Sequence, residues 1–513
     1  MRSPVQVRPS LFFNMKKKEW FKIRYYPHIG FPIRNADKKK VCSYIKTPKN
    51  IQSHSFFPFI HKTITTRRFR KEYDIERNLL NEGKRVVLEP KKRDIFYSNH
   101  LDANIFSYYG HLLNKQYTKV LRDKGLNEVV TAYRQIPHFE DDKATRNKCN
   151  IDFALEVFNF IRNKNANLVA ITFDISNFFD KLNHELLKKM WCKIFAWKEL
   201  PDDHYNVFKN ITKFSYVEEK PLFELFKYQI ITKTKSGSIK KKKIDKPKYL
   251  YNGNAIAYCE KSDIHLIRSK GLIKNNKREN GELRKVGICQ GSPISSVLAN
   301  IYMLEFDEHI KNEIEKVNGL YRRYSDDIVI VCPPSSKDFF INLLKVQIEI
   351  LVKLEIQDKK TQIFHFTIGE EDNLVCAQEI NGKINHNSYK YSFDYLGFSF
   401  NGNSISLKTS SLAKYYRKLK LNVRRCIYYS QVIRNETNGK IFKRRIYKRF
   451  SYIGAKRTRK YKRKPGTTDK WIRTDKYNWG NYITYARFAY KTMKDIRIKS
   501  QIKNHWKNIN RMI

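Results

Sequence analysis

Acidic residues are scarce in this chain of 513 residues, because 50 Asp and Glu stand against 102 Lys and Arg and leave a formal net charge of +52. A surface this positive repels itself unless a polyanion compensates it. Nucleic acid is therefore the expected partner, with an anionic membrane as the alternative. The apolar content of 41 % is ample for folded cores, and the length indicates two to four domains.

Long apolar runs are also missing. No stretch approaches the roughly 18 to 20 apolar residues that cross a bilayer, and the mean hydropathy is −0.64. Lys and Arg interrupt residues 1–26, so the apolar stretch of a secretory signal is absent. We therefore expect a cytoplasmic protein that makes no use of a membrane.

Paired cysteines are absent as well. The eight cysteines are scattered singly, with no C-x-x-C pair. This spacing argues against a zinc site, against a disulfide framework and against an appended zinc-dependent nuclease. No repeat of fixed period is visible, which excludes solenoids and propellers.

The positive charge is concentrated near the end of the chain. Residues 401–513 hold 32 Lys and Arg and four acids, a net +28. The stretch from Lys443 to Gly466 interleaves cations with Tyr and Phe, a mixture suited to phosphates and base stacking, although a solvated basic linker is the alternative. Because apolar periodicity resumes over residues 482–498, we predict a helical domain with a basic face. Its four acids are too scattered for the metal cluster of an RNase H domain.

The middle of the chain alternates between strand-like and helix-like segments. We predict a strand over Leu168–Phe173, a helix after Asn183 with that residue as N-cap, and a loop or hairpin over residues 233–249. A long amphipathic helix is predicted from Ile294, with one apolar stripe. Two short strands around Ser325-Asp326-Asp327 and a helix over residues 338–354 follow. The stripe comprises Val297, Leu298, Ile301 and Leu304.

Two acidic positions stand where an apolar strand meets a turn. Asp174 directly follows Leu168–Phe173, and Asp326-Asp327 directly precede an Ile-Val run. Carboxylates at such places are costly unless a cation compensates them. Three of them converging from neighbouring strand ends would suit a pair of Mg²⁺ ions, the arrangement used for in-line phosphoryl transfer. The alternative is that Ser325-Asp326-Asp327 is only a hairpin turn, for which Asp is favoured.

Several motifs occur in the order found in reverse transcriptases, which the region 85–400 resembles. They are FDISNFFD (Phe173 to Asp180), QGSPISSVLANIY (Gln290 to Tyr302), YSDD (Tyr324 to Asp327), KKT (Lys359 to Thr361) and YLGF (Tyr395 to Phe398). The bacterial branch with group II intron proteins, retrons and defence-associated enzymes is the most similar. Residues 91–113 and 130–134 resemble the fingers of the defence-associated, unknown-group enzymes. In length and basic C-terminal region the chain is similar to the second polymerases of type 3 two-polymerase antiphage systems.

The resemblance implies an α+β fold, that of a right-hand polymerase. Residues 85–400 would form the fingers and a palm with an antiparallel sheet, interrupted by a basic insertion around 200–286. Residues 401–513 would form a basic α-helical, thumb-like domain that binds nucleic acid, and residues 1–84 a basic N-terminal extension.

The resemblance also assigns the catalytic residues. Asp174, Asp326 and Asp327 would be the metal carboxylates for two Mg²⁺ ions, with Mn²⁺ as the alternative ion. Lys360 would protonate the pyrophosphate leaving group, although Lys359 could be confused with it. Ser325 stands where the family commonly has Ala, a small-for-small change that should preserve the turn.

Further residues are assigned to the incoming nucleotide. Phe179 matches the aromatic gate that excludes a 2′-hydroxyl, while Phe178 is expected in the core. Gln290 and Gly291 match the loop that touches nucleotide and template, where Gly permits close backbone approach. Arg93 and Arg134 match positions that grip the triphosphate, although either alone could be an ordinary surface Arg.

These assignments predict an RNA-directed DNA polymerase acting in antiphage defence. Its partners would be an RNA template, a DNA product and dNTPs, together with a noncoding RNA and a second reverse transcriptase. A group II intron maturase or a retron-type polymerase is the alternative enzyme. A catalytically silent RNA-binding scaffold is the alternative from another class, and the intact Asp174, Asp326 and Asp327 set argues against it.

Residues 1–14 do not resemble the segment that follows. Val5-Gln6-Val7 can be encoded by a string that reads like the conserved loop of a transfer-RNA gene. We expect translation to begin at Met15, the alternative being a basic N-terminal arm that binds nucleic acid. Intact mass of the protein expressed from its native upstream region checks this, since a chain beginning at Met1 would contradict it.

Overall fold

The structure is a computed structural model. It describes residues 20–71, 80, 84–140, 143–164, 166–233, 238–245, 250, 254–277, 281–369, 373–385, 392–433, 441, 443–456, 458–463, 466–469, 471–478 and 480–513. The expected start at Met15 lies outside these residues. Among them, no helix is both long and apolar enough to cross a membrane.

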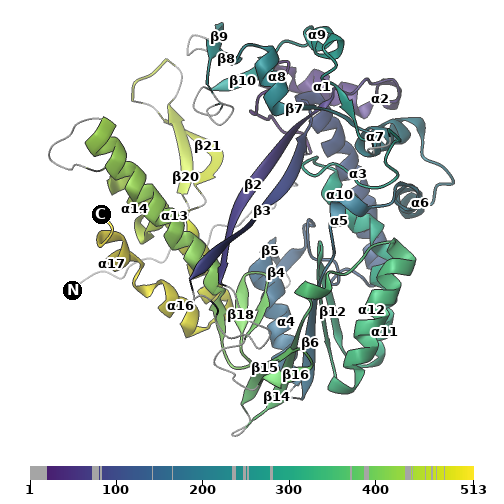
Figure 1. Ribbon diagram of the computed structural model, residues 1–513, viewed down its shortest axis with the longest axis vertical. Helices are drawn as coiled ribbons and strands as arrows, with labels where there is room; N and C mark the ends of the chain where they lie inside the picture. The colour runs from purple at the N-terminus through teal and green to yellow at the C-terminus, as the bar shows by residue number, and fades with distance from the viewer. Residues whose placement is uncertain are drawn as a thin grey trace.

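A six-stranded sheet forms the centre of the lower half of Figure 1. Its strands pair antiparallel throughout, as predicted for the palm. The predicted strand at Leu168–Phe173 is confirmed as β6, which extends one residue further to Asp174. The order is β12 (Leu320–Tyr324), β13 (Asp327–Cys332), β6 (Leu168–Asp174), β14 (Gln362–Ile368), β15 (Leu374–Ile380) and β16 (Lys383–Asn385).

Each face of this sheet belongs to a different core, because side chains alternate along a strand. Val169, Ile171 and Phe173 join a large core to which several helices contribute, among them α3 (His100–Asp123), α6 (His184–Phe195), α10 (Ser295–Tyr302), α11 (Leu304–Lys316) and α12 (Lys337–Val352). Leu168 and Ala170 join a second core with α4 (Asn150–Lys164), the small sheet β17 (Phe393–Tyr395), β18 (Phe398–Phe400) and β19 (Ile405–Leu407), and the C-terminal helices.

The helix predictions in this region hold, with one break. Asn183 caps α6 by accepting a hydrogen bond from the Leu186 amide. The predicted stripe of Val297, Leu298, Ile301 and Leu304 is buried. The helix predicted from Ile294, however, is two helices, since α10 ends at Tyr302 and α11 begins at Leu304.

The predicted extension 1–84 and insertion 200–286 are not separate additions, because their described parts share two sheets. One sheet has the order β11 (Lys274–Asn275), β7 (Ser215–Glu218), β2 (Phe59–Lys71) and β3 (Arg85–Tyr97). The other has the order β1 (His28–Ile29), β10 (Ala255–Cys259), β8 (Gln229–Lys233) and β9 (Ile239–Lys243), so residues 233–249 contain part of a hairpin. Short helices lie among these strands: α1 (Lys38–Lys46), α2 (Pro48–Gln52), α7 (Asp202–Thr212), α8 (Glu219–Leu225) and α9 (Ile264–Ser269).

Beyond their pairing with β7, β2 and β3 continue as a two-stranded ribbon. In Figure 1 this ribbon runs diagonally from the neighbourhood of β7 toward the lower end of α13 (Thr409–Tyr428). It carries the exposed cations Lys91, Lys92 and Arg93.

The C-terminal region is helical, as predicted, but it also contains strands. Its helices are α13, α14 (Lys443–Phe450), α15 (Tyr482–Met493), α16 (Ile496–Lys503) and α17 (His505–Asn510). A hairpin of β20 (Thr458–Arg463) and β21 (Trp471–Asn478) interrupts them. The predicted boundary at residue 401 cuts the sheet β17-β18-β19, so palm and C-terminal region share a core. Ile446, Phe450 and Ala455 are buried, which excludes a solvated linker over residues 443–455.

Candidate active site

Two of the three predicted carboxylates lie directly opposite each other at the ends of the central strands. In the register of β13 against β6, Asp327 pairs with Asp174. Directly opposed residues of antiparallel strands have Cβ atoms about 4.5 to 5.5 Å apart, and like charges there repel. The pairing therefore concentrates negative charge at one edge of the sheet.

Asp326 lies in the turn that joins β12 to β13. Tyr324 pairs with Asp327 across the hairpin, which leaves Ser325 and Asp326 as the turn residues. Ser325 is left-handed, with φ +63°, and the Asp326 carbonyl accepts a hydrogen bond from the Ile175 amide at 3.2 Å. Ser325-Asp326-Asp327 is thus a hairpin turn and a carboxylate site at once, so the two interpretations of the sequence do not exclude each other.

Burial and neighbouring negative charges both disfavour the ionised form of Asp327. Desolvation, followed by the charges of Asp326 and Asp174, raises the pKa of Asp327 to about 6. The Asp327 side chain is exposed to solvent, so cations from solution can reach its carboxylate. A positive charge close to these carboxylates would stabilise their ionised forms.

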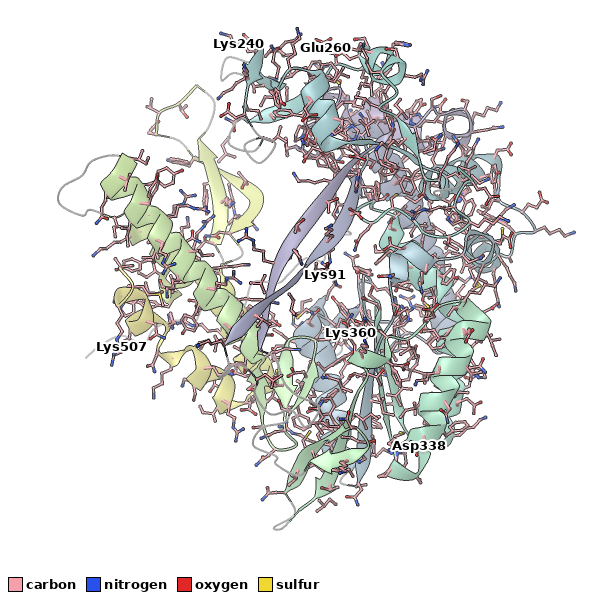
Figure 2. All side chains as sticks on the ribbon, viewed as in Figure 1. Lys91, Lys240, Glu260, Asp338, Lys360 and Lys507 are labelled. Atoms are coloured by element: carbon pink, nitrogen blue, oxygen red, sulfur yellow. The ribbon has the colours of Figure 1, made fainter. Side chains whose placement is uncertain are left out.

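Lys360 supplies one positive charge. Its Nζ lies 2.6 Å from Oδ1 of Asp174, and the side chain is about half exposed. The loop that carries it is fixed along the strand end, since the Gln357 amide donates to the Asp174 carbonyl at 2.8 Å and the Ser176 amide to the Glu355 carbonyl at 2.9 Å. Lys360 is therefore placed beside the carboxylates by backbone contacts. In the view of Figure 2 it lies near the middle of the molecule, below Lys91.

The three carboxylates fit Mg²⁺ by their chemistry, because hard oxygen donors are its preferred ligands. Their side chains are not arranged as a finished cage, since the described residues include no group of three or more His, Cys, Asp or Glu placed to hold one ion. The convergence of all three carboxylates on bound ions stays a prediction. Asp174 is turned to Lys360, and an ion would have to compete with that ammonium for the carboxylate.

The segment after Asp174 separates Phe178 from Phe179. Asn177 adopts a left-handed conformation with φ +45° and begins the short helix α5 (Phe178–Lys181). Phe178 is 4 % exposed and lies in the core, as expected. Phe179 is half-buried, and its carbonyl accepts from the Ile288 amide at 2.9 Å. Its assignment as a sugar gate remains a prediction.

Gln290 and Gly291 lie against strand β3. The Gln290 carbonyl accepts from the Phe96 amide at 2.8 Å. Gly291 has φ +117°, and a Cβ there would meet the Phe96 carbonyl oxygen at 2.8 Å. In the structure, the close approach that Gly291 permits is to strand β3, and the expected contact to a nucleotide stays a prediction.

The two predicted triphosphate arginines differ. Arg93 lies exposed on β3, one of the strands of the ribbon. Arg134 is engaged within its own loop, where it donates to the carbonyls of Asn127 and Val130 at 2.8 and 2.7 Å and to the Asn127 side chain at 2.6 Å. Arg93 is available to a ligand, whereas Arg134 could bind one only by giving up these bonds.

A buried ion pair behind the turn was missed from the sequence. Arg323 and Asp307 are both completely buried and meet through two hydrogen bonds of 2.7 and 2.6 Å. Arg323 also donates to the Ser325 carbonyl at 3.1 Å and to the Asn300 side chain at 3.2 Å. The Tyr321 hydroxyl completes the shell of Asp307 at 2.7 Å. Arg323 is therefore a positioning residue for the turn that carries Asp326.

The sequence held a signal for this pair. Arg323 is two residues from Tyr321 in β12 and pairs with Ile328, so alternation directs it to the core. Asp307 is three residues from both Leu304 and Ile310, which places it on the apolar stripe of α11. A cation and an anion that both fall on buried faces are expected to pair, because an unpaired buried charge carries a large desolvation cost.

Comparison with known proteins gives one family. Residues 238–400 match the family described as "Reverse transcriptase (RNA-dependent DNA polymerase)". This segment contains Gln290, Gly291, Asp326, Asp327 and Lys360, whereas Asp174 precedes it. The match supports an enzyme of the RNA-directed DNA polymerase class, and the mixed helices and strands fit a right-hand polymerase.

No curated protein matches the chain. Among solved structures, it is similar to apo telomerase from Candida tropicalis truncated from the C-terminal domain, with 11 % identity over 68 % of this chain and 56 % of that one, at a TM-score of 0.36. Telomerase from Candida albicans with a fragment of telomeric RNA gives 15 % identity over 75 % and 53 %, at a TM-score of 0.33. The chain thus spans about half the length of these structures.

We predict that Arg323→Met lowers the free energy of unfolding by about 3 to 5 kcal/mol, because it leaves Asp307 buried and uncompensated. The double variant Arg323→Met/Asp307→Asn should lose less, since no buried charge remains. Urea unfolding of both variants checks the order. Equal losses in the single and double variants would contradict the ion-pair account.

Proposed function

We propose that the chain is an RNA-directed DNA polymerase that adds deoxynucleotides by two-metal phosphoryl transfer. The observation that carries the proposal is the pairing of Asp174 with Asp327 beside Asp326 in the turn, at the edge of a sheet that lies partly inside the reverse transcriptase match. In-line transfer needs just such a concentration of negative oxygen ligands.

Asp174, Asp326 and Asp327 would hold the two Mg²⁺ ions. When bound, such ions make an attacking hydroxyl more acidic and neutralise charge on the attacking and leaving oxygens. Bound cations would compensate the charge of the Asp174 carboxylate, and the Lys360 ammonium would then be released from it. Its Nζ then stands beside the reacting groups and could give a proton to the pyrophosphate that leaves.

Recognition of the incoming nucleotide falls to the residues around this edge. Phe179 is held by its backbone contact to Ile288, next to the packed ring of Phe178. A half-buried aromatic face fixed in this way supports a steric gate against the 2′-hydroxyl. Arg93 on the exposed ribbon supports a contact to the triphosphate.

The C-terminal region is proposed to grip nucleic acid. The β20–β21 hairpin exposes Tyr461 by 56 % and Trp471 by 60 % among cations. Exposed aromatic rings offer faces on which bases stack, and the cations offer contacts to phosphates. In Figure 1 this hairpin lies between α13 and the fingers, on the side of the ribbon β2–β3.

Antiphage defence is the biological role that we propose. It rests on the resemblance of residues 91–113 and 130–134 to the fingers of defence-associated enzymes. A noncoding RNA, a second reverse transcriptase and cytoplasmic action belong to the same proposal. An intron maturase or retron polymerase would instead show a flanking intron or a satellite DNA.

Sequencing nucleic acid that co-purifies with the protein, with and without protease treatment, identifies template and product and shows whether synthesis starts on a protein side chain.

We predict that Asp174→Asn and Asp326→Asn each lower Mg²⁺-dependent DNA synthesis at least about a thousandfold, a barrier increase of about 4 kcal/mol. Both proteins should stay folded, since each change removes one of several repelling charges. Primer extension on an RNA template measures the rate, with circular dichroism as the check on folding. A near-wild-type rate in either folded variant would contradict the assignment.

Phe179→Ala is expected to admit ribonucleotides while it spares most deoxynucleotide incorporation. Opening the pocket changes discrimination between two sugars more than it changes the chemistry common to both. Single-nucleotide extension with matched dATP and ATP gives the selectivity, and Phe178→Leu is the control for general damage to the core. Unchanged selectivity in Phe179→Ala would return the residue to a packing role.

For the hairpin, deletion of residues 443–466 would also remove the buried Ile446 and Phe450, so point variants are sharper. Tyr461→Ala/Trp471→Ala should weaken single-strand binding at least about tenfold without changing its salt dependence, because stacking releases no counterions. Lys460→Ala/Arg473→Ala should reduce the slope of log affinity against log salt by about one to two. Anisotropy titrations at several salt concentrations measure both, and identical slopes in all three proteins would rule out a phosphate grip here.

A further inference from the structure

A cavity of about 640 Å³ lies in the C-terminal region, away from the palm carboxylates. Its walls are α13, α14 and the segment that leads into α15, and none of the carboxylates discussed above lines it. We call it the C-terminal basic pocket. It is lined by Ser411, Lys414, Tyr415, Lys418, Arg445, Lys448, Arg449, Phe450, Asn478, Gly480, Asn481 and Tyr482.

The lining carries five cations and no carboxylate. In the part of the chain that the structure describes, none of the five forms an ion pair; Arg449 donates to the side chain of Asn422, which is neutral, at 3.1 Å. Asp495, one of the few acids of this region, is already bound by the amides of Ile405 and Arg497. The charge of the pocket is therefore left for an anion from outside.

One wall of the pocket is aromatic. The rings of Tyr415 and Tyr482 stack with centroids 4.9 Å apart. The Tyr415 hydroxyl donates to the Phe450 carbonyl, but the Tyr482 hydroxyl is buried without a hydrogen-bond partner among the described residues. Burial raises the pKa of Tyr482 to about 12, so it keeps its proton. Because this hydroxyl is buried, a ligand in the pocket would meet the ring of Tyr482 and not its O–H group.

The pocket is held in shape before any ligand arrives. The Asn481 side chain caps α15 and donates to the carbonyls of Ser451 and Lys448, at 2.7 and 3.3 Å. Gly480, with φ +84°, has no room for a Cβ, which would meet the Thr484 hydroxyl at 2.0 Å. These contacts tie the end of α14 to the start of α15, and the Tyr415 hydroxyl of α13 is bound to the Phe450 carbonyl of α14, so the two helices that carry the cations are held together.

We propose that the C-terminal basic pocket binds the phosphates of a nucleotide unit through its five cations. Cations from two helices surround the space, and a volume of this size suits a nucleotide. The same chemistry could come from a free nucleotide or from a nucleotide within a strand. The proposal does not depend on polymerase activity, since the pocket and the palm carboxylates share no residue.

The test uses full-length protein in EDTA, which suppresses metal-dependent binding at the palm. Inorganic triphosphate is titrated by calorimetry into wild type, Lys414→Glu/Lys418→Glu and Lys420→Glu/Arg424→Glu. Both pairs lie four residues apart on α13 and change the net charge equally, but only the first lines the pocket. We expect the pocket pair to weaken binding at least about tenfold and the control pair less than about twofold.

Lys448→Met gives a second test, on the facing helix α14. It should weaken triphosphate binding severalfold while the melting temperature does not fall, because Lys448 forms no ion pair among the described residues and its charge is lost only to the bound phosphates. Competition by a short single-stranded DNA would identify a strand as the source of the nucleotide, and lack of competition a free nucleotide. Equal weakening in both charge-reversal pairs, or unchanged affinity in Lys448→Met, would overturn the pocket.

Discussion

The buried pair of Arg323 and Asp307 is the interaction on which the candidate site depends. Two fully buried charges are tolerable only when they satisfy each other, and here they do so with two hydrogen bonds. The remaining donors of Arg323 hold the Ser325 carbonyl and Asn300, while its backbone bonds to Val129 and Thr131. One residue thus fixes the turn that carries Asp326, with its side chain bound to α10 and α11 and its backbone bound to the segment before Arg134. The turn can then hold Asp326 and Asp327 close to Asp174 in spite of the repulsion between the three carboxylates.

The fixed turn leaves negatively charged carboxylates close together, and the protein compensates only part of this charge. Asp174 and Asp327 oppose each other across the sheet, and Lys360 compensates one of them. Burial, together with the charges of Asp326 and Asp174, raises the pKa of Asp327, so the ionised form of this carboxyl is disfavoured. A site of this kind favours bound cations, and the folded chain supplies the frame in which phosphoryl transfer could use them. The pocket between α13 and α14 presents the opposite case, a fixed surplus of positive charge.

Local patterns predicted the elements that bury an apolar face. Strand β6, the cap at Asn183 and the stripe from Val297 to Leu304 were readable because burial leaves a period in the sequence. The shared sheets of residues 28–97 and 215–275 were not, since pairing between distant strands leaves no local mark. The β20–β21 hairpin exposes Tyr461 and Trp471 and so shows no apolar alternation. Arg323 and Asp307 could have been found by asking which charges fall on buried faces, whereas the engagement of Arg134 depended on a loop conformation that no pattern gives.

The central claim is that Asp174, Asp326 and Asp327 form a cation site with which Lys360 competes. Titration of Mn²⁺ into metal-free, full-length protein, followed by the electron paramagnetic resonance signal of the free ion, tests it without any assay of activity. The account predicts weaker Mn²⁺ binding in Asp326→Asn and tighter binding in Lys360→Met, where the ammonium on Asp174 is gone. Mn²⁺ binding that is the same in wild type and both variants would contradict it.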